Sequence, residues 1–166
     1  MDPRIDEFLD EERAAWDPFK ALDRLDDVRL DDPIAAAHDW SGRDLIGHLL
    51  GWLGDALEVA GELESSPSSP ARQRSRRAFA ARGDEINAEI QAAWRAMPLR
   101  EVRRRSRDVP EELRRAIVAV PTSSWDADPG NLEFLRVYTI EHYADHAADL
   151  EAILAAAGPE STPSGA

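Results

Sequence analysis

The 166-residue sequence contains no cysteine, and this absence excludes three kinds of chemistry. Without thiols the chain cannot form disulfides, bind a metal through sulfur or use a cysteine nucleophile. Histidine and carboxylate are then the only strong protein ligands available to a transition metal. The chain has four histidines, so their spacing carries most of the information about a metal site.

Long hydrophobic runs are also missing from the sequence. No apolar stretch approaches the roughly 20 residues that span a bilayer, so we expect neither a transmembrane helix nor a membrane partner. The first residues, MDPRIDEFLDEERAAW, are acidic and lack the basic and apolar regions of a signal peptide. We therefore expect a cytoplasmic protein.

Basic residues are scarce, with 20 Lys and Arg against 33 Asp and Glu and a formal net charge of −13. Phosphate binding needs a basic field, so nucleic acid is excluded as a partner. Residues 72–115 are the exception, because they hold 13 basic and 7 acidic side chains. We interpret them as a solvated basic face opposite acidic helices. A rim that attracts a small anionic co-substrate remains an alternative.

The sequence shows no alternating strand pattern and no internal repeat. Apolar residues recur at helical spacing over residues 3–26, 40–63, 75–97, 99–120 and 130–157. Helices of this length predict an all-α fold, an antiparallel up-down four-helix bundle with one extra helix in the third crossing. We expect one domain over residues 1–158 and a flexible C-terminal tail over residues 159–166.

The second helix has the best-defined start. Ser41 is suited to cap it, and Asp44 three residues later completes the pattern of a capping box. Trp40 and Leu45 occupy the two positions of a hydrophobic staple. His48 then lies about two turns into the helix, at the edge of its apolar stripe.

Two more histidines, His142 and His146, lie four residues apart in TIEHYADHAADLEAIL, residues 139–154. At about 100° per residue both fall within the apolar stripe that includes Tyr138, so we predict that they face the core. A divalent cation shared by both rings would satisfy their nitrogens, and a facing His48 would supply a third ligand. Core histidines satisfied by ordinary hydrogen bonds are the alternative.

The segment WSGRDLIGHLLGW, residues 40–52, resembles the Trp-Ser-x-x-Asp/Glu-x-x-x-His-Leu-x-x-Trp signature of the DinB-like superfamily. The HxxxH pair near the C-terminus resembles the second metal-binding element of that superfamily. The resemblance extends over residues 3–157. It implies that His48, His142 and His146 bind a divalent metal, with zinc favoured and nickel next.

The superfamily includes DinB/YfiT proteins, the metal-binding domain of mycothiol-dependent maleylpyruvate isomerase and the ClbS/DfsB branch. The middle segment, EINAEIQAAW…VPEELRRAIVAVP, looks more like the ClbS/DfsB branch. The resemblance implies a metal-dependent enzyme that activates a thiol or water for transfer to, isomerisation of or hydrolysis of a small electrophilic molecule. A low-molecular-weight thiol would be its co-substrate, and a homodimer is expected by analogy. A non-catalytic protein that sequesters a small molecule, and a purely structural histidine cluster, are the alternatives.

Other side chains near these histidines are candidates for supporting roles. These are Trp52 and Tyr138 as pocket walls, Asp55 as a pocket base, and Asp145 and Asp149 as carboxylates that orient an imidazole. Each has an ordinary alternative, since aromatic residues at helical spacing pack in cores and helix carboxylates are usually solvated. His38, in the loop before the second helix, is assigned no chemical role.

Overall fold

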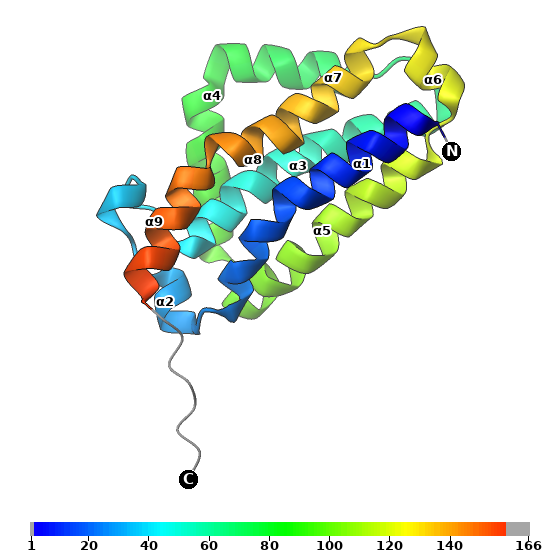
Figure 1. The fold of residues 1–166 in the computed structure, drawn as a ribbon. Helices are drawn as coiled ribbons and strands as arrows, with labels where there is room; N and C mark the ends of the chain where they lie inside the picture. The colour runs from blue at the N-terminus through cyan, green and yellow to red at the C-terminus, as the bar shows by residue number, and fades with distance from the viewer. Residues whose placement is uncertain (1, 159–166) are drawn as a thin grey trace.

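The computed structural model describes residues 2–158, and its regular structure is helical (Figure 1). No strand occurs in that range, where the one extended pairing is an isolated bridge between Ile34 and Trp40. The prediction of an all-α protein is therefore confirmed for these residues. None of the helices described is both long and apolar enough to cross a membrane. The predicted flexible tail, residues 159–166, lies outside the described residues.

The first half contains α1 (Pro3–Trp16), a 3₁₀ segment (Asp17–Arg24), α2 (Asp27–Asp31), a 3₁₀ turn (Ala35–Ala37) and α3 (Gly42–Ser65). The second half contains α4 (Pro70–Ala96), α5 (Leu99–Ala119), α6 (Thr122–Ala127), α7 (Gly130–Arg136), a π-helical turn (Val137–Glu141), α8 (His142–Asp145) and α9 (Ala147–Ala157). In Figure 1, α1, α3, α5 and the α7–α9 segment run side by side, and α3 contacts both α4 and α5.

The predicted start of α3 is confirmed in detail. Ser41 caps the helix by accepting the backbone N–H of Asp44, and the Asp44 carboxylate accepts the backbone N–H of Ser41 in return. This capping box fixes where the helix begins. The α3 helix then continues unbroken for 24 residues, so it forms a rigid support for His48.

Glycines on one face of α3 allow α4 to pack closely against it. A Cβ atom at Gly47 would lie 2.6 Å from the Trp94 Cβ, and one at Gly51 would lie 2.5 Å from the Ile90 Cγ2. Both distances are too short for real carbon atoms, so any larger residue would force the two helices apart. The close approach keeps the part of α4 around Ile90 and Trp94 against α3.

Several predicted boundaries differ from the structure. The α4 helix begins at Pro70 rather than near residue 75, because Ser69 caps it and the Glu62 carboxylate accepts the backbone N–H of Ala71. The Ser/Pro connection is correspondingly short. Non-helical angles at Arg82 bend α4, as Figure 1 shows. The short helices α2 and α6 form outside the ranges that we predict as helical from the sequence.

The prediction of one continuous helix over residues 130–157 is wrong. A π-helical turn occupies Val137–Glu141, and His146 has non-helical angles, φ −103° and ψ 9°, between α8 and α9. Three of the five residues in the π turn are β-branched, which weakens regular helical packing. A helical wheel with 100° per residue therefore misplaces side chains beyond Arg136.

A buried ionic cluster joins three helices. Arg114 of α5 donates from Nε to Glu12 Oε2 of α1 at 2.5 Å and from Nη2 to Glu12 Oε1 at 3.2 Å. The Tyr143 hydroxyl of α8 also donates to Glu12 Oε1, at 3.1 Å. All three side chains are buried, and burial raises the pKa of Tyr143 well above its ordinary value. The cluster holds α8, which begins at His142, against α1 and α5.

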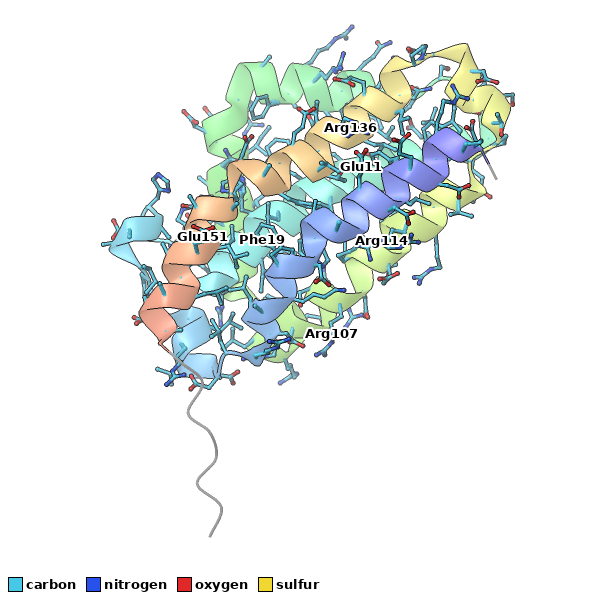
Figure 2. All side chains as sticks on the ribbon, viewed as in Figure 1. Glu11, Phe19, Arg107, Arg114, Arg136 and Glu151 are labelled. Atoms are coloured by element: carbon cyan, nitrogen blue, oxygen red, sulfur yellow. The ribbon has the colours of Figure 1, made fainter. Side chains whose placement is uncertain are left out.

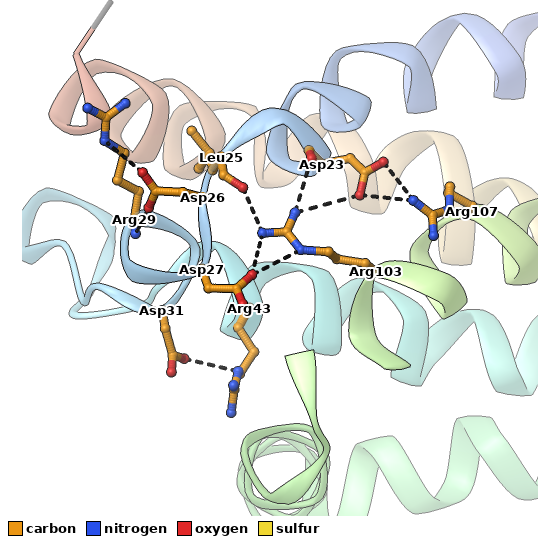
Figure 3. A network of polar contacts seen from close by, with 9 residues as sticks. All are labelled: Asp23, Leu25, Asp26, Asp27, Arg29, Asp31, Arg43, Arg103 and Arg107. Carbon is orange, nitrogen blue, oxygen red and sulfur yellow. Dashed lines mark hydrogen bonds and ion pairs between the residues drawn. The ribbon is translucent and has the colours of Figure 1, made fainter. Parts of the chain in front are cut away.

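Arginines of α5 also attach the α1–α3 connection. Arg103 donates to the backbone carbonyls of Asp23 and Leu25 and to the carboxylate of Asp27, while Arg107 pairs with Asp23 (Figure 3). These contacts hold the irregular segment that precedes the turn at His38. Much of the basic charge in residues 72–115 thus pairs with acidic groups of the same chain.

Replacing Glu12 with Ala tests the buried cluster. We expect a loss of about 3–5 kcal/mol in the free energy of unfolding, because Arg114 would keep only its pair with the more exposed Glu111 and Tyr143 would lose its acceptor. Urea denaturation monitored by circular dichroism measures the loss. The matched control is Glu11→Ala, which removes only the more exposed pair with Arg136 shown in Figure 2. It should cost no more than about 1 kcal/mol, and equal losses would contradict the assignment.

Candidate metal centre

Three of the four histidines converge from separate elements. His48 lies on α3, His142 begins α8, and His146 occupies the break between α8 and α9. Each offers a ring nitrogen, and these three atoms all lie within 4.8 Å of one another. The ring centroids are 4.7, 4.8 and 5.0 Å apart. The predicted approach of His48 to the later pair is therefore confirmed, and the cluster is compact enough to hold a metal ion.

Two of these imidazoles are in direct contact. His48 Nε2 and His142 Nε2 are 2.9 Å apart, and only one of them can carry the proton between them. Burial, and then the neighbouring imidazoles, lower the pKa of His142 to about 3. Burial and the nearby His146 lower the pKa of His48 to about 4. Both rings are therefore neutral near pH 7, the form that binds metals.

Asp149 fixes the orientation of the third imidazole. Its Oδ2 lies 2.8 Å from His146 Nδ1, and its Oδ1 lies 3.0 Å from His38 Nδ1. An ionised carboxylate only accepts hydrogen bonds, so Nδ1 of His146 carries the proton. The lone pair of His146 is then on Nε2. A carboxylate in this position is common behind metal-binding histidines.

The two carboxylates proposed from the sequence thus lie in different surroundings. Asp149 is buried between two imidazoles, whereas Asp145 is exposed and hydrogen-bonds to no described imidazole. His38, to which we assigned no role, contacts Asp149 from a turn in which His38 and Asp39 have positive φ angles of 57° and 59°. That turn brings the side chain back toward α9. Sequence spacing gave no signal for this contact.

Trp40 covers the cluster from one side. Its ring stacks on His146 at a centroid distance of 5.5 Å and an interplanar angle of 22°, and it lies 4.8 Å from the His48 ring. We had interpreted Trp40 only as a staple residue at the start of α3. Its position directly before the capping Ser41 is what places it over the histidines.

A pocket of about 270 Å³ opens beside the histidines. Its lining consists of His48, Trp52, Phe79, Asn87, Val137, Tyr138, His142 and Asp145. Trp52 and Tyr138 thus form walls, as expected, and Trp52 donates from Nε1 to Asn87 Oδ1 at 2.9 Å. Phe79 is 54% exposed and packs edge-on against Trp52.

Asp55 lies behind the pocket wall and is not part of the lining. Ser75 Oγ of α4 donates to Asp55 Oδ2 at 2.5 Å and lies 2.8 Å from the Tyr138 hydroxyl. Burial raises the pKa of the Asp55 carboxyl above its ordinary value. Sequence reasoning missed Ser75, because the predicted helix started at that residue and no motif includes it.

The pocket lining contains no arginine or lysine. Arginines on α4 pair instead with acidic groups, as Arg74 does with Glu58 and Arg82 with Glu85 and Glu89. Asp145 is the one carboxylate among the described residues of the lining. These contacts favour the interpretation of residues 72–115 as a basic face paired with acidic groups. They do not favour a rim that attracts an anionic co-substrate.

Comparisons of the chain with protein-family models, curated proteins and solved structures find no match. The interpretation of the centre accordingly depends on the residues and distances described above.

The lowered histidine pKa values predict a pH-dependent stability for the metal-free protein. Their folded-state pKa values, about 4 and about 3, lie below the unfolded value of about 6.5, so the unfolded chain binds more protons in between. The free energy of unfolding should therefore decrease as the pH falls from about 6.5 toward about 4. Urea titrations across this range measure the slope, which His142→Asn should reduce. Ring signals of His48 and His142 that titrate near pH 6.5 in NMR spectra would contradict the prediction.

Proposed function

We propose that the chain is a divalent-metal-dependent enzyme of the DinB-like type, with His48, His142 and His146 as its protein ligands. Zinc is the favoured metal and nickel the second candidate. The single observation that carries the proposal is the convergence of His48 with the distant pair His142 and His146, beside a pocket that His48 and His142 line. The signature around His48, and the capping box inside it, support the same assignment.

The donor set fits zinc. Zinc–nitrogen bonds of about 2.0–2.1 Å at tetrahedral angles separate the ligand nitrogens by about 3.3 Å. The nitrogens of His48 and His142 are 2.9 Å apart, and all three ligand atoms lie within 4.8 Å, so small ring rotations meet this requirement. Three protein ligands beside an open pocket are typical of catalytic zinc sites, whereas structural sites usually have four.

We extend the proposal to the architecture. We assign α1, α3, α5 and the α7–α9 segment to the four positions of an antiparallel DinB-like bundle, with α4 as the additional helix. Their side-by-side course in Figure 1 supports this assignment, as do the contacts of α3 with α4 and α5. The metal ligands then lie on two of the four positions, α3 and the last segment.

The proposed reaction takes place on a small electrophilic molecule. The enzyme transfers a thiol to this molecule, isomerises it or hydrolyses it. When bound, the metal would supply Lewis acidity that lowers the pKa of a thiol or water and polarises the electrophile. Asp149 keeps His146 in one tautomer, and Trp52, Phe79 and Tyr138 offer apolar walls that exclude water. A pocket of about 270 Å³ suits a small molecule or one part of a larger one.

Metal affinity tests the centre directly. Replacing His48, His142 or His146 with Ala should weaken zinc binding by more than about 100-fold. Asp149→Asn should weaken it by about 10–100-fold, because one neutral amide oxygen would replace the two carboxylate oxygens that now accept from His146 and His38. Competition with a chelating dye measures each affinity. The matched control is Asp145→Asn, which makes the same charge change on the same segment at a carboxylate that hydrogen-bonds to no described imidazole. Equal effects of the two Asn variants would contradict the role of Asp149.

Turnover separates an enzyme from a sequestering protein. Zinc-loaded protein should consume many equivalents of para-nitrophenyl acetate, or of chlorodinitrobenzene in the presence of a thiol, above the uncatalysed rate. Absorbance follows both reactions, and metal removal should abolish the excess rate without unfolding the protein. Consumption that stops at one equivalent per chain would instead support the ClbS/DfsB-like sequestering alternative.

A further inference from the structure

A chain of hydrogen bonds leads from the pocket wall to the half-buried carboxyl of Asp55. The Tyr138 hydroxyl, on the π turn, lies 2.8 Å from Ser75 Oγ on α4. Ser75 Oγ lies 2.5 Å from Asp55 Oδ2 on α3. Ser75 is buried, Asp55 and Tyr138 are partly buried, and only Tyr138 reaches the pocket. Three separate elements thus each supply one member of the chain.

The single proton on each hydroxyl sets the direction of these bonds. While Asp55 is ionised it can only accept, so Ser75 donates its proton to Asp55. Tyr138 must then donate its own proton to Ser75, and its oxygen lone pairs face the pocket. If Asp55 carries a proton, both bonds can reverse. Ser75 then donates to Tyr138, and the Tyr138 proton is free to point into the pocket.

The surroundings of Asp55 favour proton uptake. Burial is the main cause of its raised pKa. The hydrogen bond from Ser75 and the charge of Arg74 act against it, and the neighbouring Glu58 adds to the rise. Burial also raises the pKa of Tyr138, with Asp55 acting in the same direction and Arg76 against it. Tyr138 therefore keeps a proton near pH 7, and Asp55 is the member that can gain or lose one.

We propose that Tyr138, Ser75 and Asp55 form a proton relay between the pocket and Asp55. A pocket molecule with an acidic O–H or S–H group gives its proton to the Tyr138 oxygen. The Tyr138 proton passes to Ser75 Oγ, and the Ser75 proton passes to Asp55 Oδ2. The molecule is left as an anion and Asp55 as a neutral acid, with no change in oxidation state. The reverse sequence returns the proton to a leaving group.

The relay gives the three residues distinct roles. Tyr138 faces the pocket and exchanges the proton with the bound molecule, whereas Ser75 positions the Tyr138 hydroxyl and passes the proton on. Asp55 stores it. The use of the relay in catalysis rests on the proposed function, but the hydrogen-bonded switch itself exists without metal or substrate. The two proposals can therefore fail separately.

A titration of the full-length, metal-free protein tests the switch. Isotope labels at aspartate carboxyl carbons and at tyrosine Cζ report on Asp55 and Tyr138 by NMR. The sequence has only two tyrosines, so a Tyr138→Phe spectrum assigns the signals. Tyr138 Cζ should shift with the same midpoint as the Asp55 carboxyl, because reversal of the hydrogen bonds changes the partner of its oxygen. Tyr143, bonded to Glu12, serves as the internal reference.

Ser75 variants separate a relay from simple proximity. Ser75→Ala should abolish the pH-dependent shift of Tyr138 Cζ, here called the Tyr138 step, while Asp55 still titrates. Ser75→Thr should restore this step, since threonine keeps the hydroxyl. If the alanine variant does not fold, Asp55→Asn must remove the same step by removing the titrating group. A Tyr138 step that persists in either variant would arise from the nearby histidines and would overturn the relay. Absence of the step in the unmodified protein would overturn it as well.

Discussion

The candidate centre depends on keeping imidazoles neutral while they are in contact. His48 and His142 approach to 2.9 Å in a partly buried site, where protonating both rings would place two positive charges side by side. Burial and mutual repulsion prevent this by lowering both pKa values. With both rings neutral, one shared proton or one ion between the two nitrogens satisfies the pair. The arrangement is therefore suited to a cation.

The scaffold holds the histidines by different means on the two sides of the site. His48 lies on a long, capped helix, so its position is set by regular geometry. His142 and His146 lie on a segment that is interrupted at the π turn and again at His146. Tyr143, between them, is fixed by Glu12 in the buried cluster with Arg114. Single π-helical turns within α-helices occur frequently at functional sites.

The helical fold, the start of α3 and the three clustered histidines could be predicted from the sequence, since periodicity, capping chemistry and HxxxH spacing are local signals. The contacts of His38 with Asp149 and of Trp40 with His146 could not, because they depend on a turn with positive φ angles. A helical wheel with a uniform 100° per residue also could not predict the π turn or the break at His146. The role of Ser75 could not be predicted either, because its partners come from two other elements.

Metal analysis with X-ray absorption spectroscopy tests the central claim most directly. The protein should be purified without a histidine tag, since a tag would add metal-binding imidazoles of its own. The account predicts one zinc or nickel ion per chain, with histidine nitrogens in its first shell and no sulfur ligand from the protein. Purified protein that contains no divalent metal, and that binds neither zinc nor nickel with micromolar affinity, would contradict it.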